Sequence, residues 1–256
     1  MYKVSERFPR LRLLENKETA PGTEVSRFIN SVFGTSHMYS YLEIGVWTGR
    51  TIEAIKAKKR VAVDPDPRYL SSLSRSVKTY KCTSDSFFLN RNSGDFDCVY
   101  LDGLHHFEQT WRDIRNSTSI MRSKGVIFID DVVPIDKYSA LIPEKYAISE
   151  RRKNTGSRNA AWHGDIYKVM LLFQYLPENF TFGTIEFRKN PRAFLFCQDG
   201  KWSSFPELDD KLMASIERRE VETVFQFSSK TIIPDYFNPM SPESAETILK
   251  KHFTGG

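Results

Sequence analysis

The sequence has few cysteines, no long uncharged apolar run and no apolar stretch near its amino terminus. The three cysteines, Cys82, Cys98 and Cys197, form no CxxC pair, so we expect neither a disulfide framework nor a structural zinc site. No run approaches the ~20 apolar residues that a membrane-spanning helix needs. Residues 1–17 carry charges throughout, which argues against a secretory signal. We therefore expect a cytoplasmic globular protein without a membrane partner.

The composition is that of a folded chain of moderate size. Of its 256 residues, 40% are hydrophobic and 13% aromatic, enough to bury a sizeable core and to exclude a disordered chain. At roughly 150 residues per domain, the length fits one large domain or two small ones. The net charge of +5 is spread thinly along the chain. Such a charge permits acidic partners without requiring them.

Short apolar runs alternate with stretches of helical spacing in the first half of the chain. This alternation predicts an α/β fold with a parallel sheet that is covered on both faces. The expected strands are residues 38–44, 60–63, 77–82, 97–101 and 125–129. The expected helices between them are residues 51–57, 67–76 and 107–121.

The pattern changes in the second half. Asp165 is expected to cap a helix over residues 165–176, which Pro177 closes. The β-rich runs 180–187 and 193–197 are joined by too few residues for a helical crossover, so they should pair as an antiparallel hairpin. A further helix is expected over residues 209–223.

Acidic residues follow the expected strands with unusual regularity. They are Glu43, Asp64, Asp85, Asp102, Asp130 and Asp131. In open α/β sheets, ligands bind beyond the carboxyl ends of the strands. Aspartate also caps helices and favours turns, so each of these residues taken alone has a structural explanation. Their repetition at successive strand ends favours a shared binding site.

The turn after the first expected strand contains Gly45 and Gly49. Glycine lets the backbone turn tightly and approach a ligand closely. The turn lacks the GxGxxG pattern of dinucleotide folds, which disfavours a phosphate-binding loop and a nicotinamide dehydrogenase. Asp64 follows about twenty residues later, the usual place for a carboxylate that binds ribose hydroxyls. Together these features predict a nucleoside-containing cofactor without a pyrophosphate.

From Tyr41 to Val133, these motifs resemble the class I S-adenosylmethionine-dependent methyltransferases. The first turn is most similar to the metal-dependent O-methyltransferases of the catechol type, whose first motif also reads Glu-x-Gly-x-x-x-Gly. The resemblance implies a doubly wound, mostly parallel, seven-stranded Rossmann-like sheet with an antiparallel terminal hairpin. It implies S-adenosylmethionine as cofactor, with Glu43 at its methionine end, Asp64 at the ribose and Ser84 near the adenine. The cofactor-binding residues that it implies are Glu43, Gly45, Trp47, Thr48, Gly49, Thr51, Asp64, Ser84, Asp85, Ser86 and Asp102.

The same resemblance suggests how the chain is organised. We predict a single methyltransferase domain over residues 1–256. Its parts are a helical lead at 1–36, a cofactor-binding core at 37–200 and a carboxyl-terminal extension at 201–256.

Three carboxylates end the fourth and fifth expected strands, at Asp102, Asp130 and Asp131. Crowded carboxylates repel one another unless a cation lies between them, and oxygen ligands suit a hard divalent ion such as Mg²⁺. The catechol-type family holds its metal with an aspartate after the fourth strand and an acidic-plus-amide pair after the fifth. Asp102 and Asp130 match that pattern, whereas Asp131 stands where the family has asparagine. The predicted metal ligands are therefore Asp102, Asp130 and Asp131.

His105 stands three residues after Asp102, where the catechol-type enzymes have a basic lysine. An imidazole with a pKa near ~6.5 can take a proton from a hydroxyl that a metal has acidified. We therefore predict that His105 and Asp102 are catalytic. His106 has a structural explanation, as a residue that packs or caps at a helix start.

Residues 150–159 form a polar, basic stretch that we interpret as a loop. Its charges, including the run from Arg151 to Lys153, are interpreted as solvated surface. Trp162 and His163 follow it. They either cover the substrate pocket or supply a ligand or base, or else they pack beneath the helix that Asp165 caps.

The predicted function is methyl transfer from S-adenosylmethionine to a hydroxyl of a small molecule, a natural product or a sugar, assisted by a divalent cation such as Mg²⁺. The preference for such acceptors rests on analogy with related enzymes that carry an Asp-Gly-x-His segment. No RNA-binding module is present, which disfavours a nucleic-acid partner. The alternatives are a nucleic-acid or protein methyltransferase and a non-catalytic cofactor-binding module. A homo-oligomer is compatible with the sequence.

Overall fold

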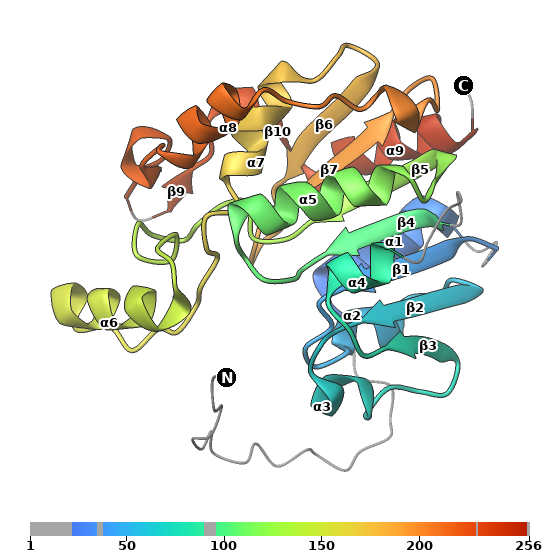
Figure 1. The fold of residues 1–256 in the computed structure, drawn as a ribbon, viewed down its shortest axis with the longest axis horizontal. Coiled ribbons are helices and arrows are strands. Elements are labelled where there is room, and N and C mark those ends of the chain that lie inside the picture. Colours follow the sequence, from blue (N-terminus) through green and yellow to red (C-terminus); the bar gives the residue numbers. More distant parts are fainter. Residues whose placement is uncertain (1–21, 35–37, 90–95, 229, 255–256) are drawn as a thin grey trace.

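The central feature of the fold is a mixed β-sheet with helices on both faces (Figure 1). The structure, a computed structural model, describes residues 22–34, 38–89, 96–228 and 230–254. Within these residues, eight strands form the sheet in the order β10-β6-β7-β5-β4-β1-β2-β3. The strands are β1 (Ser40–Ile44), β2 (Lys59–Val63), β3 (Val77–Tyr80), β4 (Phe96–Leu101), β5 (Met121–Ile129), β6 (Phe180–Ile185), β7 (Arg192–Cys197) and β10 (Pro239–Met240). Strands β8 (Gln226–Phe227) and β9 (Thr231–Ile232) pair separately.

Strand directions follow the expected pattern. Strands β1 to β5 pair in parallel, whereas β7 runs antiparallel to both β5 and β6. The predicted parallel sheet with an antiparallel hairpin is thus confirmed. The short strand β10 joins the outer edge beside β6, and its two residues are too few to leave a pattern in the sequence.

The helices cover the sheet on both sides. The described α-helices are α1 (Glu24–Phe33), α2 (Arg50–Ala54), α3 (Pro67–Leu70), α4 (Ser84–Phe88), α5 (Phe107–Thr118), α6 (Glu144–Thr155), α7 (Lys168–Leu172), α8 (Asp210–Glu217) and α9 (Pro242–Thr254). Helix α1 lies within the predicted amino-terminal lead, of which residues 1–21 and 35–36 fall outside the described residues. None of the described helices has both the length and the apolar character needed to cross a membrane.

The two faces of the sheet build two separate hydrophobic cores. On β4, Val99 and Leu101 belong to the core that also contains Trp111 of α5. Cys98 and Tyr100 alternate with them and belong to the opposite core, together with residues of α1 and α9. Side chains that point to opposite faces are both buried, so the strand is apolar along nearly its whole length. This explains why short apolar runs predicted the strands well.

The order of the strands reverses at β1, which pairs with both β2 and β4. The last residues of the neighbouring strands are aligned, since Ile44 is paired with Val63 and with Leu101. Leu101 is in turn paired with Ile129 of β5. Four strands therefore end at one edge, at the switch point where open α/β sheets bind ligands.

Several expected helices differ from those observed. The stretch interpreted as a loop at 150–159 begins inside α6, which projects away from the sheet at the left of Figure 1. The expected helix 67–76 has only one turn, α3, and the expected helix 165–176 is α7 followed by a short 3₁₀ turn. Pattern reading missed α6 because only Ala147 and Arg151 on it are buried. A helix without an apolar face has no periodic signal.

Arg151 also departs from its expected role as a solvated charge. Its side chain is 1% exposed and forms a two-pronged ion pair with Asp136, with bonds of 2.8 and 2.9 Å. Its third nitrogen donates to the carbonyl of Asn159. A guanidinium buried in this way connects the segment after β5 to α6 and is shielded from solvent.

Candidate active site

The turn after β1 is built around close backbone contacts. Gly45 has a φ of +81°, and a Cβ on it would lie 2.0 Å from the carbonyl oxygen of Asp102. Only glycine therefore lets this turn approach the turn after β4. Next to it, Glu43 is 2% exposed and accepts a hydrogen bond of 2.7 Å from the Tyr41 hydroxyl. Burial outweighs that bond and raises the pKa of Glu43 well above its usual range.

Asp64, predicted to hold a ribose, supports the same turn. One of its carboxylate oxygens accepts from the Val46 backbone N–H at 2.9 Å, and the other accepts from Asp66 N–H at 2.8 Å. Each oxygen has a second lone pair for a further donor. The carboxylate thus joins the ends of β1 and β2 and keeps its capacity to bind hydroxyls.

The remaining residues predicted in the first turn take different positions. Trp47 is 67% exposed and has a φ of +41°, and Thr48 is exposed as well. Gly49, also at positive φ, is the N-cap residue of α2. The Thr51 hydroxyl is turned toward Thr23, before α1, at 3.1 Å. Thr51 therefore fastens α2 to the amino-terminal segment.

The segment predicted to lie beside the adenine opens α4. Gln109 of α5 donates to the Ser84 hydroxyl at 3.1 Å and to the Asp85 carboxylate at 3.2 Å. Asp85 also pairs with Arg112 at 3.1 Å. The backbone N–H of Ser86 donates to Thr83, the N-cap residue. Gln109 was missed from the sequence, since a polar residue on a helix surface carries no distinguishing signal.

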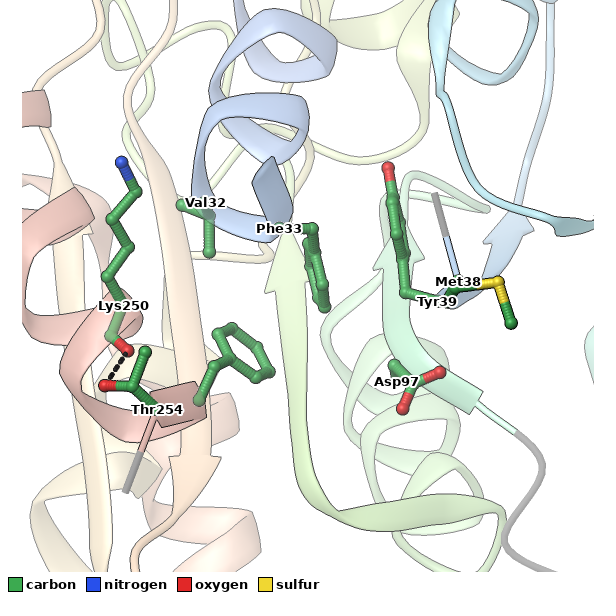
Figure 2. A pocket seen from close by; sticks show the side chains of 8 residues that line it. Val32, Phe33, Met38, Tyr39, Asp97, Lys250 and Thr254 are labelled. Carbon is green, nitrogen blue, oxygen red and sulfur yellow. Dashed lines mark hydrogen bonds between the residues drawn. The ribbon is translucent and has the colours of Figure 1, made fainter. Parts of the chain in front are cut away.

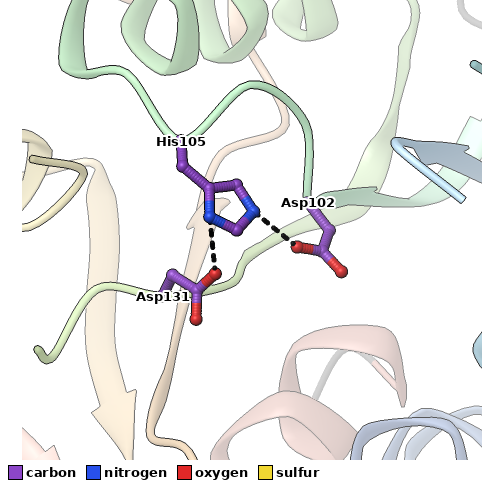
Figure 3. A group of neighbouring side chains, drawn as sticks. All are labelled: Asp102, His105 and Asp131. Atoms are coloured by element: carbon purple, nitrogen blue, oxygen red, sulfur yellow. Dashed lines mark ion pairs between the residues drawn. The ribbon is translucent and has the colours of Figure 1, made fainter. Parts of the chain in front are cut away.

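The turns after β4 and β5 bring three functional groups together, as Figure 3 shows. The His105 ring lies between two carboxylates, with Nε2 3.3 Å from Asp102 Oδ1 and Nδ1 3.1 Å from Asp131 Oδ2. One ligand atom from each of the three residues lies within 4.8 Å of the others. Nδ1 also faces the Trp162 carbonyl oxygen at 3.3 Å. Since both nitrogens face only acceptors, both must donate, and the ring is an imidazolium here.

Backbone strain coincides with this group. His105 has a φ of +58° and Asp131 a φ of +57°, the left-handed region that residues with a Cβ rarely adopt. Such conformations cost roughly 1–3 kcal/mol each and concentrate at functional sites. The fold tolerates this strain at the two residues whose side chains meet.

Asp130 does not join the group. Its Oδ2 accepts from the Tyr100 hydroxyl and pairs with Arg192 at 3.1 Å. Its Oδ1 accepts from Asn190 at 2.8 Å and from the backbone N–H of Asp131. Of the three predicted metal ligands, the structure therefore brings Asp102 and Asp131 together and turns Asp130 toward the β6–β7 hairpin. Arg192 and Asn190 lie about sixty residues further along the chain, so sequence spacing gave no signal of this pairing.

The segment around residues 162–164 closes over His105. The Trp162 ring stacks on the His105 ring at 5.1 Å with an interplanar angle of 23°, and its N–H donates to Leu141. Gly164 has a φ of +61°, and a Cβ there would lie 1.7 Å from the His105 carbonyl oxygen. His106 occupies the N-cap position of α5 without a side-chain capping bond.

Two further side chains of this segment have distinct partners. Asp165 was expected to cap its own helix, but its carboxylate accepts from the Phe107 N–H at 2.7 Å, at the start of α5. It also pairs with Lys168. His163 is 4% exposed, and its Nε2 lies 3.7 Å from Asp131 Oδ1. Its Nδ1 has no hydrogen-bond partner among the described residues.

Charges within the group shift the ionisation of its members. Burial and the charge of Asp130 raise the pKa of Asp102 to about 7. Burial would lower the pKa of His105, but its bond to Asp102 and the charge of Asp131 outweigh burial and raise it to about 9. Burial lowers the pKa of His163, which therefore favours the neutral ring. The group thus combines two carboxylates, a charged imidazole and a neutral one.

This donor set fits a divalent cation. Two carboxylates crowded around a proton-bearing imidazole have the charge that a cation can neutralise in place of that proton. The oxygens of Asp102 and Asp131 are suitable ligands. The same position can also hold or accept a proton through His105.

A cavity at the other end of the strands is separate from this group (Figure 2). It has a volume of ≈ 320 Å³ and is lined by residues that include Tyr39, Asp97 and Phe253. Tyr39 precedes β1 and Asp97 lies near the start of β4, so the cavity is at the amino-terminal ends of the strands. It contains none of the predicted site residues.

Comparison with known proteins gives one family match. Residues 42–132 match the family model of a methyltransferase domain. The matched range begins in β1 and ends after β5, so it includes the first turn and both acidic turns. No curated protein matches the sequence.

Several solved structures are similar to this chain at low sequence identity. Cofactor-bound Rv0187 from MTB is 17% identical, with a TM-score of 0.50, over 75% of this chain and 84% of that one. The O-methyltransferase TomG from Streptomyces achromogenes, in complex with SAM, is 12% identical with a TM-score of 0.46, over 68% and 78% of the two chains. An O-methyltransferase from Bacillus cereus in complex with SAH is 13% identical with a TM-score of 0.46, over 68% and 79%.

Proposed function

We propose, from the premise that this chain carries a class I S-adenosylmethionine-dependent methyltransferase domain, that it methylates a hydroxyl of a small molecule with the help of a divalent cation. A natural product or a sugar is the acceptor class that we propose. The observation that carries the proposal is the position of His105. Its ring lies between the carboxylates of Asp102 and Asp131, and the backbone of Asp102 lies against the glycine turn that follows β1.

The residues around the first turn would hold the cofactor. Asp64 joins the turn to β2 and has lone pairs for two ribose hydroxyls. Glu43 lies buried beneath the turn, where its pKa is raised. Ser84 and Asp85, fixed by Gln109, would stand beside the adenine. The methyl group would then face the turn after β4, where the proton-accepting residue is.

His105 would act on the acceptor. Its Nδ1–H is held by Asp131 and by the Trp162 carbonyl, so the ring keeps one orientation. Its Nε2, which faces Asp102, is the atom that would take the hydroxyl proton. The oxygen is then free to attack the sulfonium methyl in line. Because Nε2 must first release its own proton, turnover should rise with pH.

Asp102 and Asp131 would hold the cation. When bound, a divalent cation supplies positive charge that lowers the pKa of the acceptor hydroxyl and of His105. Trp162 stacks on His105 and would keep water from that face of the ring. The left-handed backbone at His105 and Asp131 would hold their side chains in these positions before a ligand binds.

The test combines binding and turnover. Calorimetry should show S-adenosylhomocysteine binding with a dissociation constant in the micromolar range. The full chain, incubated with S-adenosylmethionine, Mg²⁺ or Mn²⁺ and a panel of catechols, flavonoids and glycosides, should yield methylated product by mass spectrometry. Chelation with EDTA should stop the reaction. Absence of S-adenosylhomocysteine binding would contradict the proposal, and full activity in EDTA would contradict its cation.

The remaining partners are also proposals. We propose that nucleic acid and membranes are not partners, that the protein acts in the cytoplasm and that self-association is compatible with activity. One arginine of the basic run, Arg151, is buried in its pair with Asp136, which supports a weaker basic surface. A steep salt dependence of RNA or DNA binding would favour a nucleic-acid acceptor instead.

A further inference from the structure

We propose that Asp113 is a positioning residue for the cofactor, and that it acts through Gln109 and Ser84 on the segment proposed to lie beside the adenine. The inference rests on the proposed function, since it concerns the binding of S-adenosylmethionine. It adds a residue of α5 that has no part in the proposed transfer of the methyl group.

Asp113 is buried between two parts of the proposed cofactor site. It lies within α5 and is 3% exposed, which is unusual for an aspartate unless its oxygens have partners. Its Oδ1 accepts a hydrogen bond of 2.9 Å from Gln109 Nε2, one turn earlier on the same helix. Its Oδ2 faces the turn after β4, where a Cβ on Gly103 would lie 3.9 Å from it. The carboxylate thus lies against the turn after β4 and, through Gln109, is joined to the start of α4.

One side-chain amide joins this carboxylate to α4. Gln109 Nε2 is bonded to Asp113 at 2.9 Å, and the same nitrogen lies 3.1 Å from Ser84 Oγ and 3.2 Å from Asp85 Oδ1. An amide nitrogen has two hydrogens, so these three acceptors share them. The contact with Asp113 is the shortest, and Asp113 is buried, whereas the side chain of Asp85 is 45% exposed. Asp113 therefore fixes the amide, and the amide in turn holds the start of α4.

The charge of Asp113 sets the strength of this network. Hydrogen bonds from Ser84 and Gln109 lower its pKa, but burial outweighs them and raises it to about 6. The charged groups that act on this pKa are Asp85 of α4, which raises it, and Arg112 of α5, which lowers it. An ionised carboxylate is a stronger acceptor than a neutral one. The network is therefore strongest above this pKa and weakens as Asp113 takes up a proton.

Helix α4 depends on such contacts because it is short. It has five residues, and its own supports are the cap from Thr83 and the burial of Phe87 and Phe88 near its end. Helices of this length are marginal on their own. The bonds from α5 order Ser84 and Asp85 before a ligand binds, and a preorganised site loses less entropy on binding. Weakening the network should therefore weaken cofactor binding.

The experiment measures S-adenosylhomocysteine affinity of the full chain by calorimetry. Asp113→Asn keeps the size of the side chain and removes its charge, so we expect the affinity at pH 8 to fall roughly 10-fold, the effect of one weakened buried hydrogen bond. At pH 5, Asp113 of the unaltered protein is itself mostly protonated, so the difference between the two proteins should shrink to less than about 3-fold. Groups that titrate in both proteins cancel in this comparison.

Asp97→Asn is the matched control. Asp97 also accepts from a serine hydroxyl, that of Ser40 at 2.7 Å, and pairs with Arg122 at 2.9 Å. It lies near the start of β4, at the opposite end of the strand from the proposed site. Its substitution should leave S-adenosylhomocysteine affinity unchanged at both pH values.

The pH dependence separates positioning from a purely structural role. If Asp113→Asn leaves the affinity unchanged, or lowers it equally at both pH values, the inference is wrong, because the charge of Asp113 is then not coupled to the ligand. A double-mutant cycle tests the route. In a Gln109→Ala background, Asp113→Asn should have a clearly smaller effect, and additive effects would overturn the inference.

Gln109→Glu covers the case in which Asp113→Asn fails to fold, since Gln109 is only half-buried. It puts a second carboxyl beside Asp113, and two carboxyls so close repel each other unless they share a proton. This variant should lose affinity between pH 5 and pH 8 roughly 10-fold more than Gln109→Ala does. Equal pH dependence of the two variants would contradict the inference. Failure of the unaltered protein to bind S-adenosylhomocysteine would instead contradict the proposed function.

Discussion

The two halves of the site treat their carboxylates differently. On the proposed cofactor side, Asp64 is held by two backbone N–H groups and serves as a fixed part of the turn. On the proposed acceptor side, the Asp102 side chain faces His105. Asp131 faces the imidazoles of His105 and His163 and accepts a hydrogen bond from Asn190. The first arrangement is complete without a ligand. The second combines repulsion, raised pKa values and backbone strain, and a cation would relieve much of this.

This contrast indicates which side of the site stabilises the fold and which side is arranged for chemistry. Hydrogen bonds to the backbone stabilise a carboxylate and keep the turn rigid. Crowded charges and left-handed backbone at His105 and Asp131 oppose stability and persist only because the surrounding fold imposes them. The acceptor side is therefore the side on which small substitutions should change activity without changing cofactor binding.

The largest effect should come from Asp131→Asn. The amide keeps the shape of the side chain but removes the charge that orients His105 and would bind the cation. We expect the rate of methyl transfer to fall roughly 10²- to 10⁴-fold, the range of a lost acid–base function, with S-adenosylhomocysteine affinity unchanged. Steady-state kinetics and calorimetry measure both. Asp210→Asn, an exposed aspartate on α8, is the control.

Arg192→Met should distinguish the structural role of Asp130 from the proposed metal-binding role of Asp131. Removing the guanidinium leaves Asp130 buried without its ion pair, so the free energy of unfolding should fall by roughly 3–5 kcal/mol. Urea denaturation measures this, with exposed Lys189→Met as control. The Co²⁺ affinity of the folded protein should stay unchanged. A loss of Co²⁺ binding in this variant would show that Asp130 takes part in the metal site.

The pKa of His105, measured before any cation is added, should test this account of the proposed acceptor side. Its pKa is raised to about 9 in the folded, metal-free protein, against an ordinary value of 6.5. The protonated ring therefore adds stability that is present in full below pH 6.5 and is lost as the pH rises through 9. NMR of the imidazole should report this pKa, and a divalent cation should lower it. A metal-free pKa at or below 6.5 would contradict this account of the site.

The smallest effect should come from Arg112→Ala on the cofactor side. Arg112 pairs with Asp85, but their side chains are 54% and 45% exposed. Exposed pairs of this kind contribute about 0–1 kcal/mol, so thermal unfolding should shift little. Gln109→Ala should have the greater effect on S-adenosylhomocysteine affinity, because Gln109 holds both Ser84 and Asp85. The reverse order would show that charge, rather than the glutamine bridge, positions this segment.

Much of the fold was predictable because burial leaves a direct trace in the sequence. Strands β1, β2, β4 and β5 are covered on both faces, so they read as apolar runs within a few residues of their observed bounds. The predicted resemblance to methyltransferases agrees with the match of residues 42–132 to the family model of a methyltransferase domain. Helix α6 could not be predicted in this way, because most of its side chains are exposed or carry charge. The end-to-end alignment of the strands also explains why Asp102 and Asp131 were expected to meet.

The details of the site were less accessible. Whether Asp130 or Asp131 faces His105 depends on a left-handed backbone at Asp131 and on Arg192 in a distant hairpin. The position of His163 depends on Gly164, whose positive φ lets the segment lie against His105. These contacts join residues that are about sixty positions apart and follow no period. Sequence spacing alone cannot reveal them.

The flat contact between Trp162 and His105 gives the protein an internal optical indicator. Indole fluorescence is quenched by a charged imidazole more strongly than by a neutral one, so the emission of Trp162 will brighten when His105 loses its extra proton. A cation that lowers the pKa of His105 will therefore change the fluorescence intensity of Trp162, without any added label.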